Sequence, residues 1–248
     1  MRVPKWADAA VSLIVGLIIW QVVGVLKVSI SFPPFTDVVK AWIMLFNKGR
    51  IQQPLLDSLY ELLLGFAIAA VVGVIIGTLM GRYRTARMIF EPYINAAMSS
   101  PIVAFVPILI LIFGIGRSSM IAISFLMAVF VVIVNTQSGI RNSEANLIEM
   151  ARSFGATEWQ LLTLILIPGA LPAVMTGLRA AVGRAVRGVI VGEMLIAVVG
   201  TGGLIDEYGQ SFNIPYLWAL LLTVMLMAVV PMGVVDLADK RLHHWKNG

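Results

Sequence analysis

The sequence has no cysteine and few charged residues. None of its 248 residues is a cysteine, only 12% are charged, 59% are hydrophobic, and mean hydropathy is +0.94. The absence of cysteine excludes disulfides, thiolate metal sites and cysteine nucleophiles. The scarcity of charge argues against a soluble domain, because a soluble chain of this length carries more polar surface. The composition therefore predicts a membrane protein.

Sites for chemistry are also missing. The only histidines, His243 and His244, are neighbours that project differently and have no further ligands nearby, so we expect no metal site. The sequence contains no G-x-x-x-x-G-K-[ST] phosphate loop and no paired carboxylates or nucleophile and base on one membrane face. We expect no catalytic residues and no bound cofactor, and a membrane enzyme is the weakest alternative.

Long apolar runs account for most of the chain. Crossing about 30 Å of hydrocarbon takes roughly 20 helical residues. Five uncharged runs reach about this length, at 9–26, 62–81, 92–116, 118–140 and 208–235, and we expect the first to be retained rather than cleaved as a signal peptide. A sixth run, 168–194, is apolar but interrupted by charge. The sequence predicts an all-α membrane protein with six transmembrane helices in a single domain, 1–248.

The basic residues cluster at membrane ends, which explains the net charge of +5 without nucleic acid. With six spans both termini share one side. Ten basic residues fall on that side: Arg2, Lys5, Arg82, Arg84, Arg87, Arg141, Arg152, Lys240, Arg241 and Lys246. Five fall on the other: Lys27, Lys40, Lys48, Arg50 and Arg117. The excess predicts cytoplasmic termini, with the basic tail near anionic lipid headgroups.

Three further patterns indicate local structure. Residues 35–46, after Phe32-Pro33-Pro34, predict an amphipathic helix at the outer interface. Small residues recur every fourth position along 65–81, which predicts close helix packing within the chain or with a second copy. The glycine-rich stretch 200–203 interrupts a short apolar run, and predicts either an external re-entrant or gating element or a flexible loop.

The segment at about 141–168, between the fourth and fifth spans, predicts two short helices. Asn142 or Ser143 can cap a first helix with Glu144 in its first turn. Gly155 is suited to end that helix in a left-handed conformation. Thr157 and Gln160 fit a capping box that starts a second helix, which Pro168 and Pro172 would then bend into the membrane. The result would be a rigid cytoplasmic elbow able to transmit motion.

This elbow resembles the EAA loop of permease subunits of bacterial binding-protein-dependent ABC importers. The motif here is Glu149-x-Ala151-x-x-x-Gly155-Ala156 followed by Ile165-x-Ile167-Pro168. Met150, Leu162 and Ile167 depart from the usual alanine, aromatic and leucine. Other segments resemble the nitrate, sulfonate and taurine branch: Phe32-Pro33-Pro34, Ser58-Leu59, Leu64-Gly65-Phe66, 113–116 and 192–195. Tyr60-Glu61 stands where that branch usually carries a basic residue.

The resemblance implies a bacterial inner-membrane machine of several chains. Two permease chains would surround one pathway, and we expect a homodimer, with a heterodimer of two different permeases as the alternative. Two separate ATPase subunits would bind ATP and Mg, and a periplasmic or lipid-anchored binding protein would deliver the solute. The ATPase-coupling residues would be Glu149, Ala151, Arg152, Gly155, Ala156 and Pro168. Glu149 would meet donors on the ATPase, Gly155 would set the corner, and both alanines would permit close approach.

Polar groups inside the spans are candidates for the translocation pathway, because ionisable side chains are costly there. Arg179, Arg184 and Arg187 share an arc of roughly 140° on one helix, and guanidinium groups pair well with oxyanions. The arginines therefore predict an anionic solute. The resemblance to the nitrate, sulfonate and taurine branch implies a small anion of the sulfonate, nitrate or carboxylate class. The pathway candidates are Arg184, Arg187, Glu193, Ser99, Ser100 and Asn135.

Two alternatives remain open at this point. The arginines could instead bond carbonyls, anchor the helix end, or pair with Glu193 or Glu61, and the serines and Asn135 could bond neighbouring helices. The whole chain could instead be an ion-gradient-driven carrier or channel, for which Glu61 and Glu193 are the only intramembrane acids.

Overall fold

The computed structural model describes residues 5–143, 145–196 and 200–243, and these residues form helices joined by short connections. No strand occurs among them. The elements, in chain order, are α1 (Lys5–Val25), α2 (Phe35–Asn47), α3 (Gln52–Arg82), α4 (Arg84–Ser99), the 3-10 turn η1 (Ile102–Phe105), α5 (Val106–Phe113), α6 (Arg117–Arg141), α7 (Ala145–Ser153), α8 (Glu158–Gln160), the π-helical turn η2 (Leu161–Leu166), α9 (Ile167–Ile196), α10 (Gly200–Gln210), α11 (Ile214–Met227) and α12 (Val229–His243). The expected all-α class is confirmed.

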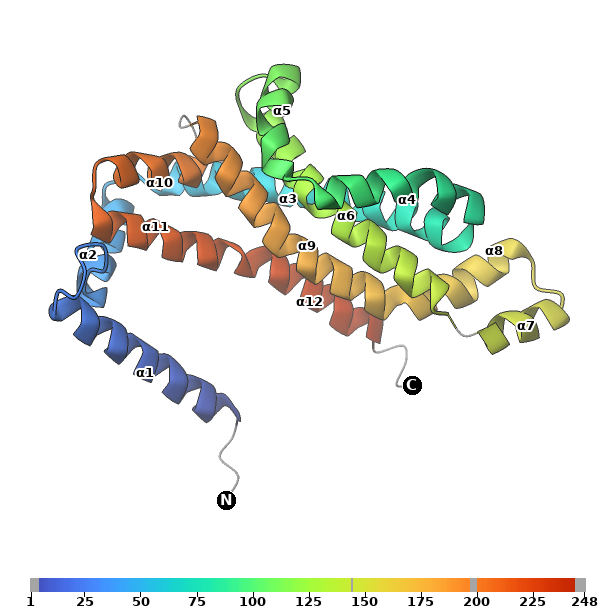
Figure 1. Ribbon diagram of the computed structural model, residues 1–248. Coiled ribbons are helices and arrows are strands. Elements are labelled where there is room, and N and C mark those ends of the chain that lie inside the picture. The colour runs from blue at the N-terminus through green and yellow to red at the C-terminus, as the bar shows by residue number, and fades with distance from the viewer. Residues whose placement is uncertain (1–4, 144, 197–199, 244–248) are drawn as a thin grey trace.

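The core lies where α3, α6 and α9 pack along their lengths (Figure 1). Small and branched side chains fill it, including Leu62, Ala69, Val132, Val182 and Ala185, each fully buried. In a bilayer such packing relies on close van der Waals contact, because lipid is as apolar as the side chains. We call these three helices the frame; α4, α5, α10 and α12 pack directly on it, whereas α2 packs on α11 and α1 on α2.

The stripe of small residues on α3 packs against α6 of the same chain. A Cβ built on Gly77 would lie 2.6 Å from the carbonyl oxygen of Ile133, and one on Gly81 would lie 2.6 Å from the Cβ of Ile140. Gly65 and Gly73 face α6 in the same way. The absent side chains let the two backbones approach, which resolves the choice between an internal partner and a second copy.

Among the residues that the structure describes, four helices are long and apolar enough to cross a membrane: Gln52–Arg82, Arg117–Arg141, Glu158–Ile196 and Ile214–Arg241. A fifth crossing is obtained if the bent pair α4 and α5 counts as one span. In α1 the apolar part, Val11–Val25, is shorter than the others. Helix α1 extends away from the frame (Figure 1). Its apolar side chains from Val11 onward are mostly exposed. Six crossings remain a prediction that depends on α1.

The predicted span at 92–116 is wrong as a single helix. Helix α4 begins earlier, at Arg84, and ends at Ser99, and the chain then bends by 97° into η1 and α5. Proline disfavours helical geometry in the residue before it, and Ser100, which precedes Pro101, is extended with ψ 147°. The break follows from that Ser-Pro pair, whereas Pro92 is accommodated inside α4.

The last predicted span, 208–235, begins too early. Tyr208 belongs to α10, and the spanning helix starts at Ile214 after Phe212, whose φ of 54° turns the chain. The stretch 200–203 is not a flexible loop, because it forms the buried first turn of α10. Residues 197–199 lie outside the described part of the chain. Helix α10 packs on α9, α3 and α11 at one end of the frame (Figure 1).

The amphipathic helix expected at 35–46 is confirmed as α2. Its buried face, Val38, Ala41 and Leu45, packs on α11, and Trp42 donates a 3.0 Å hydrogen bond to the hydroxyl of Thr223. Trp20 of α1 donates to the carbonyl of Pro33, so the end of α1 is tied to the entrance of α2. These contacts fix the end of the molecule that also holds α10.

Candidate functional site

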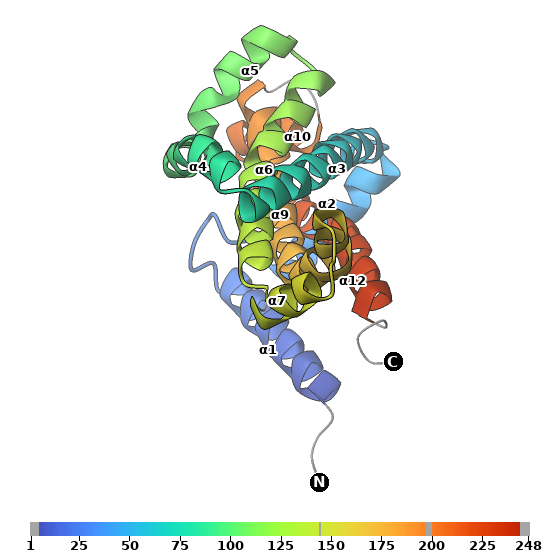
Figure 2. The same cartoon turned by 90° about the vertical axis from the view of Figure 1, so that its right-hand side faces the viewer.

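The predicted elbow is present as a short helix, a corner and a helical restart. Helix α7 and helix α8 project from one end of the frame, the end opposite to α10 (Figures 1 and 2). Helix α8 continues through η2 into α9, so that Glu158–Ile196 is one helix of 39 residues. The elbow is therefore attached directly to a membrane span, as the sequence predicts.

The corner is built by Gly155. Its φ is +77°, a conformation that strains residues with a Cβ. The Gly155 amide donates to the carbonyl of Arg152 at 2.9 Å, and the Ala156 amide donates to that of Ala151 at 3.0 Å. This pair of bonds is a Schellman motif, which satisfies the last carbonyls of a helix. The backbone groups of Ala151 and Ala156 thus form one of the two hydrogen bonds that close the corner, and their side chains are small.

The restart after the corner is the predicted capping box. The Thr157 amide donates to the side chain of Gln160 at 2.8 Å, and the Gln160 amide donates to the Thr157 hydroxyl at 3.3 Å. The cap that the sequence predicts for α7, Asn142 or Ser143, does not directly precede that helix, which begins at Ala145. Asn142 ends α6 by donating its amide to Ser138, while Glu144 lies outside the described residues. Half-buried Ser143 lies close to Gly169.

The prolines do not interrupt the chain's entry into the membrane. Pro168 is the second residue of α9, and Pro172 lies inside that helix. The π-helical turn η2 comes directly before Pro168. Because proline has no amide proton and crowds the carbonyl four residues earlier, a wider turn there accommodates it. The expected bend thus takes the form of a local widening within a continuous helix.

The surface of α7 and its corner is unusually apolar for an exposed element. Phe154 is 85% exposed, Trp159 72% and Met150 53%, and the predicted Glu149 and Arg152 are exposed beside them. Contiguous exposed apolar side chains ringed by charge are typical of a protein interface. Sequence reasoning missed Phe154 and Trp159, although an aromatic residue on each side of the corner was the available signal.

An acidic residue that the sequence did not single out ties the elbow to the frame. Glu158 pairs with Arg82 at the end of α3 and with Arg152 of α7, the latter at 3.4 Å. One carboxylate thus links the frame to both helices of the elbow. The pairs are partly exposed, so their contribution to stability is small, but they restrict where α7 can lie.

At the other end of the frame, Glu193 lies in a buried polar cluster. Its carboxylate accepts hydrogen bonds from the Ser58 hydroxyl at 2.6 Å and from the Gly202 amide at 2.7 Å. Ser58 in turn accepts from the Thr201 amide at 2.9 Å. The Glu61 carboxyl group, also buried, interacts directly with that of Glu193. Glu193 therefore joins α9 to α3 and α10 instead of facing an open surface.

The three arginines of α9 have different surroundings. Arg179 is paired with Asp236 at 2.8 Å and Asp239 at 2.6 Å, both on α12. Arg187 donates to the carbonyl of Gly183 in its own helix at 3.1 Å. Arg184 is half-buried and makes no ion pair with any residue that the structure describes. Within the described chain, none of them pairs with Glu61 or Glu193.

The remaining pathway candidates divide into two groups. Asn135 donates its side-chain amide to the carbonyl of Val131 at 2.8 Å and packs against Gly177, so it lies between α6 and α9. Ser99 and Ser100 lie at the 97° break after α4, where Ser99 is exposed. Irregular backbone at membrane depth is found where it is buried in protein or lines a cavity. The Ser100 hydroxyl donates to the carbonyl of Ala96 at 2.8 Å, so it is already bonded to its own helix.

Comparison with known proteins decides the family. A model of the family described as "Binding-protein-dependent transport system inner membrane component" matches residues 69–244, which include the elbow and α9. The chain belongs to this family. As an ABC importer permease it is a transport subunit and not an enzyme, and the resemblance found in the elbow is confirmed at the level of the family.

Relatives of this permease carry several names. It is 29% identical to the putative aliphatic sulfonates transport permease SsuC of Bacillus subtilis, over 98% of this chain and 88% of that one. It is 27% identical to the taurine transport permease TauC of Escherichia coli, over 94% and 88%. It is 30% identical to the riboflavin transport permease RibX of Chloroflexus aurantiacus, over 95% and 89%. The sulfonate and taurine names agree with the predicted branch.

Solved structures support the fold. The permease matches a chain of the inward-facing MetNI methionine ABC transporter with a TM-score of 0.59 and 19% identity, over 74% of this chain and 94% of that one. At this identity the likeness concerns the arrangement of helices alone. The permease shares the helical arrangement of that transporter chain.

Proposed function

We propose that this permease is the transmembrane subunit of an ATP-driven importer and that α7 with its corner docks on a separate ATPase subunit. The observation that carries the proposal is an exposed apolar and charged surface on a rigid elbow continuous with a membrane span. The surface suits a groove in a partner. The continuous helix from Glu158 to Ile196 would transmit the partner's movement into the bundle.

In this mechanism the permease does no chemistry. ATP and Mg bind the partner chains, whose closure pushes the elbows and rearranges two permease chains between inward and outward states. Glu149 and Arg152 would make charged contacts with the ATPase. Gly155, held by Ala151 and Ala156, would keep the corner rigid, and Pro168 would mark the entry into the span. A periplasmic or lipid-anchored binding protein would supply the solute.

Substitution at Gly155 tests this coupling. A Cβ there meets nothing within 4 Å, so a new side chain strains the backbone without crowding a neighbour. Gly155→Val, whose branched side chain disfavours positive φ, should abolish ATP-driven uptake in vesicles while ATPase activity and membrane insertion persist. Gly155→Asn, which tolerates this conformation, is the matched control and should retain uptake. Unchanged uptake by Gly155→Val would refute the coupling role.

We further propose that the solute is a small anion of the sulfonate, nitrate or carboxylate class. Arg184 and Arg187 support this, because both lie on α9 and neither forms an ion pair with a described residue. Names of the sulfonate and taurine relatives support it too. Ser99 and Ser100, at the break after α4, and Asn135, between α6 and α9, would contribute to the same pathway.

The solute class can be tested with charge-removing variants. Arg184→Gln with Arg187→Gln should reduce uptake of an organic sulfonate such as taurine by about tenfold or more, because charge-assisted bonds to the anion are lost. Arg179→Gln is the control, since that guanidinium is already paired with α12. Uptake of taurine is also measured in the presence of unlabelled nitrate or riboflavin. Inhibition by nitrate indicates an anion pathway, whereas inhibition by riboflavin indicates one that is not selective for small anions. Equal uptake by wild type and the double variant would remove the anion assignment.

A further inference from the structure

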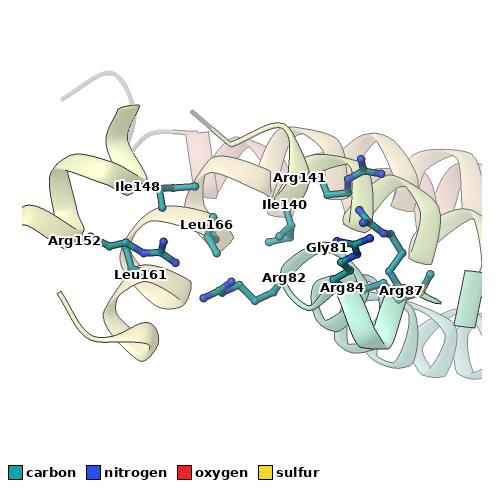
Figure 3. A pocket seen from close by; sticks show the side chains of 11 residues that line it. Gly81, Arg82, Arg84, Arg87, Ile140, Arg141, Ile148, Arg152, Leu161 and Leu166 are labelled. Atoms are coloured by element: carbon teal, nitrogen blue, oxygen red, sulfur yellow. The ribbon is translucent and has the colours of Figure 1, made fainter. Parts of the chain in front are cut away.

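A recess lined by arginines lies where the elbow meets the frame. Its volume is about 300 Å³, and it is bounded by the end of α3, the start of α4, the end of α6, α7 and η2. Five arginines line it: Arg82, Arg84, Arg87, Arg141 and Arg152. We call it the basic recess. Figure 3 shows Arg82 of α3 and Arg152 of α7 pointing toward each other, with Arg84, Arg87 and Arg141 to the right of Arg82.

The positive charge in the basic recess exceeds the negative charge that the described chain places there. Glu158 neutralises Arg82 and Arg152 in part. Arg84, Arg87 and Arg141 form no ion pair with a described residue, and no carboxylate is among the residues that line the recess. Glu91 is the nearest acid in the adjoining cavity, which shares Arg141. Guanidinium groups converging without counter-charges repel one another, so the arrangement favours a bound anion.

The donors match one kind of anion best. A guanidinium presents a planar fork of donors that fits phosphate oxygens, and several forks can bind one phosphate at once. The base of the basic recess is apolar, with Ile140, Ile148 and Leu166, which suits carbon atoms attached to the phosphate. Both α3 and α6, each long and apolar enough to cross a membrane, end here. Basic pockets at this depth can accept lipid headgroups.

We propose that the basic recess binds a phosphate-bearing anion, either the headgroup of an anionic phospholipid or a free phosphate compound. Given the proposed role of α7 in coupling, on which this consequence rests, the ligand would bridge α7 to the ends of α3 and α6. It would hold the elbow against the frame by replacing repulsion among the arginines with shared contacts. The recess is thus a candidate site for regulation of coupling.

The full chain in nanodiscs provides the test, independently of any ATPase. In one arm, nanodiscs of phosphatidylcholine alone are titrated with inorganic pyrophosphate by calorimetry. In the other, native mass spectrometry measures phosphatidylglycerol retained from mixed discs against phosphatidylcholine. Binding in either arm should weaken by about tenfold or more in Arg84→Gln/Arg87→Gln. The control Arg241→Gln removes an exposed charge of α12 outside the recess and should change neither arm.

Each outcome has a distinct reading. Retention of phosphatidylglycerol that the double variant loses identifies a lipid headgroup, and loss of a pyrophosphate signal identifies a free phosphate. If the double variant fails to fold, Arg141→Gln replaces it, because Arg141 is exposed and makes no ion pair with a described residue. Equal binding by wild type and variants in both arms overturns the proposal. That result does not bear on the Gly155 assay.

Discussion

At the scale of single residues, Glu193 shows how a buried charge can organise an outer element. Its carboxylate accepts a hydrogen bond from the Gly202 amide in the first turn of α10, where backbone amides have no partner within the helix. A Cβ on Gly200 would overlap the Glu193 carboxyl group, and one on Gly202 would lie 2.6 Å from the Glu193 Cβ. The glycines at 200 and 202 are therefore required by the approach of a helix to a carboxylate, which spacing alone does not reveal.

Ser58 provides the residue-scale test of this cluster. Ser58→Ala removes the hydroxyl between Glu193 and the Thr201 amide and leaves both buried groups with one partner fewer. We expect a loss of about 1–3 kcal/mol in stability, read as a lower thermal unfolding midpoint of the purified permease. Thr176→Ala is the control, because that hydroxyl bonds only the carbonyl of Pro172 in its own helix. Equal midpoints for both variants would contradict a structural role for the cluster.

At the scale of elements, the sequence predicted the features that depend on residues close together in the chain. The capping box at Thr157 and the glycine corner at 155 are local, and both are confirmed. The break after Ser99 was missed because a long apolar run outweighed Ser100-Pro101. The glycines at 200–203 left a re-entrant or gating element and a flexible loop as alternatives, and did not predict the helix α10. Helix α10 is held by contacts with Ser58 and Glu193, which are distant in sequence. Contacts between residues distant in sequence therefore stabilise helices that local propensity does not predict.

The α3 and α6 interface gives an element-scale prediction. Gly77→Ala would place a methyl group 2.6 Å from the Ile133 carbonyl oxygen, so the two helices must separate. Overpacking of this kind costs about 1–3 kcal/mol, and the thermal unfolding midpoint in detergent should fall. Gly233→Ala on α12 is matched, because a Cβ there meets nothing within 4 Å, and it should keep the wild-type midpoint. A Gly77→Ala variant as stable as wild type would mean that the stripe does not set the helix spacing.

At the scale of the whole molecule, the two ends of the frame do different work. One end holds α2, α10 and the buried carboxylates, and the other holds the elbow and the basic recess (Figure 1). The long helix from Glu158 to Ile196 joins them, because Glu158 pairs with Arg152 of α7 and with Arg82 at the end of α3, and Glu193 contacts α10. Movement of the elbow would therefore reach α10 through a single rigid element.

Orientation of these ends can be measured because the sequence contains no cysteine. A single introduced cysteine is then the only thiol in this chain that a membrane-impermeant maleimide can label. If the excess of basic residues sets the topology, Lys48→Cys should be labelled in intact spheroplasts, and Arg241→Cys only after permeabilisation. Lys5→Cys decides whether α1 crosses: protection like that of Arg241→Cys supports six spans, whereas labelling like that of Lys48→Cys leaves five. Labelling of Arg241→Cys in intact spheroplasts would place the elbow outside, where no ATPase could reach it.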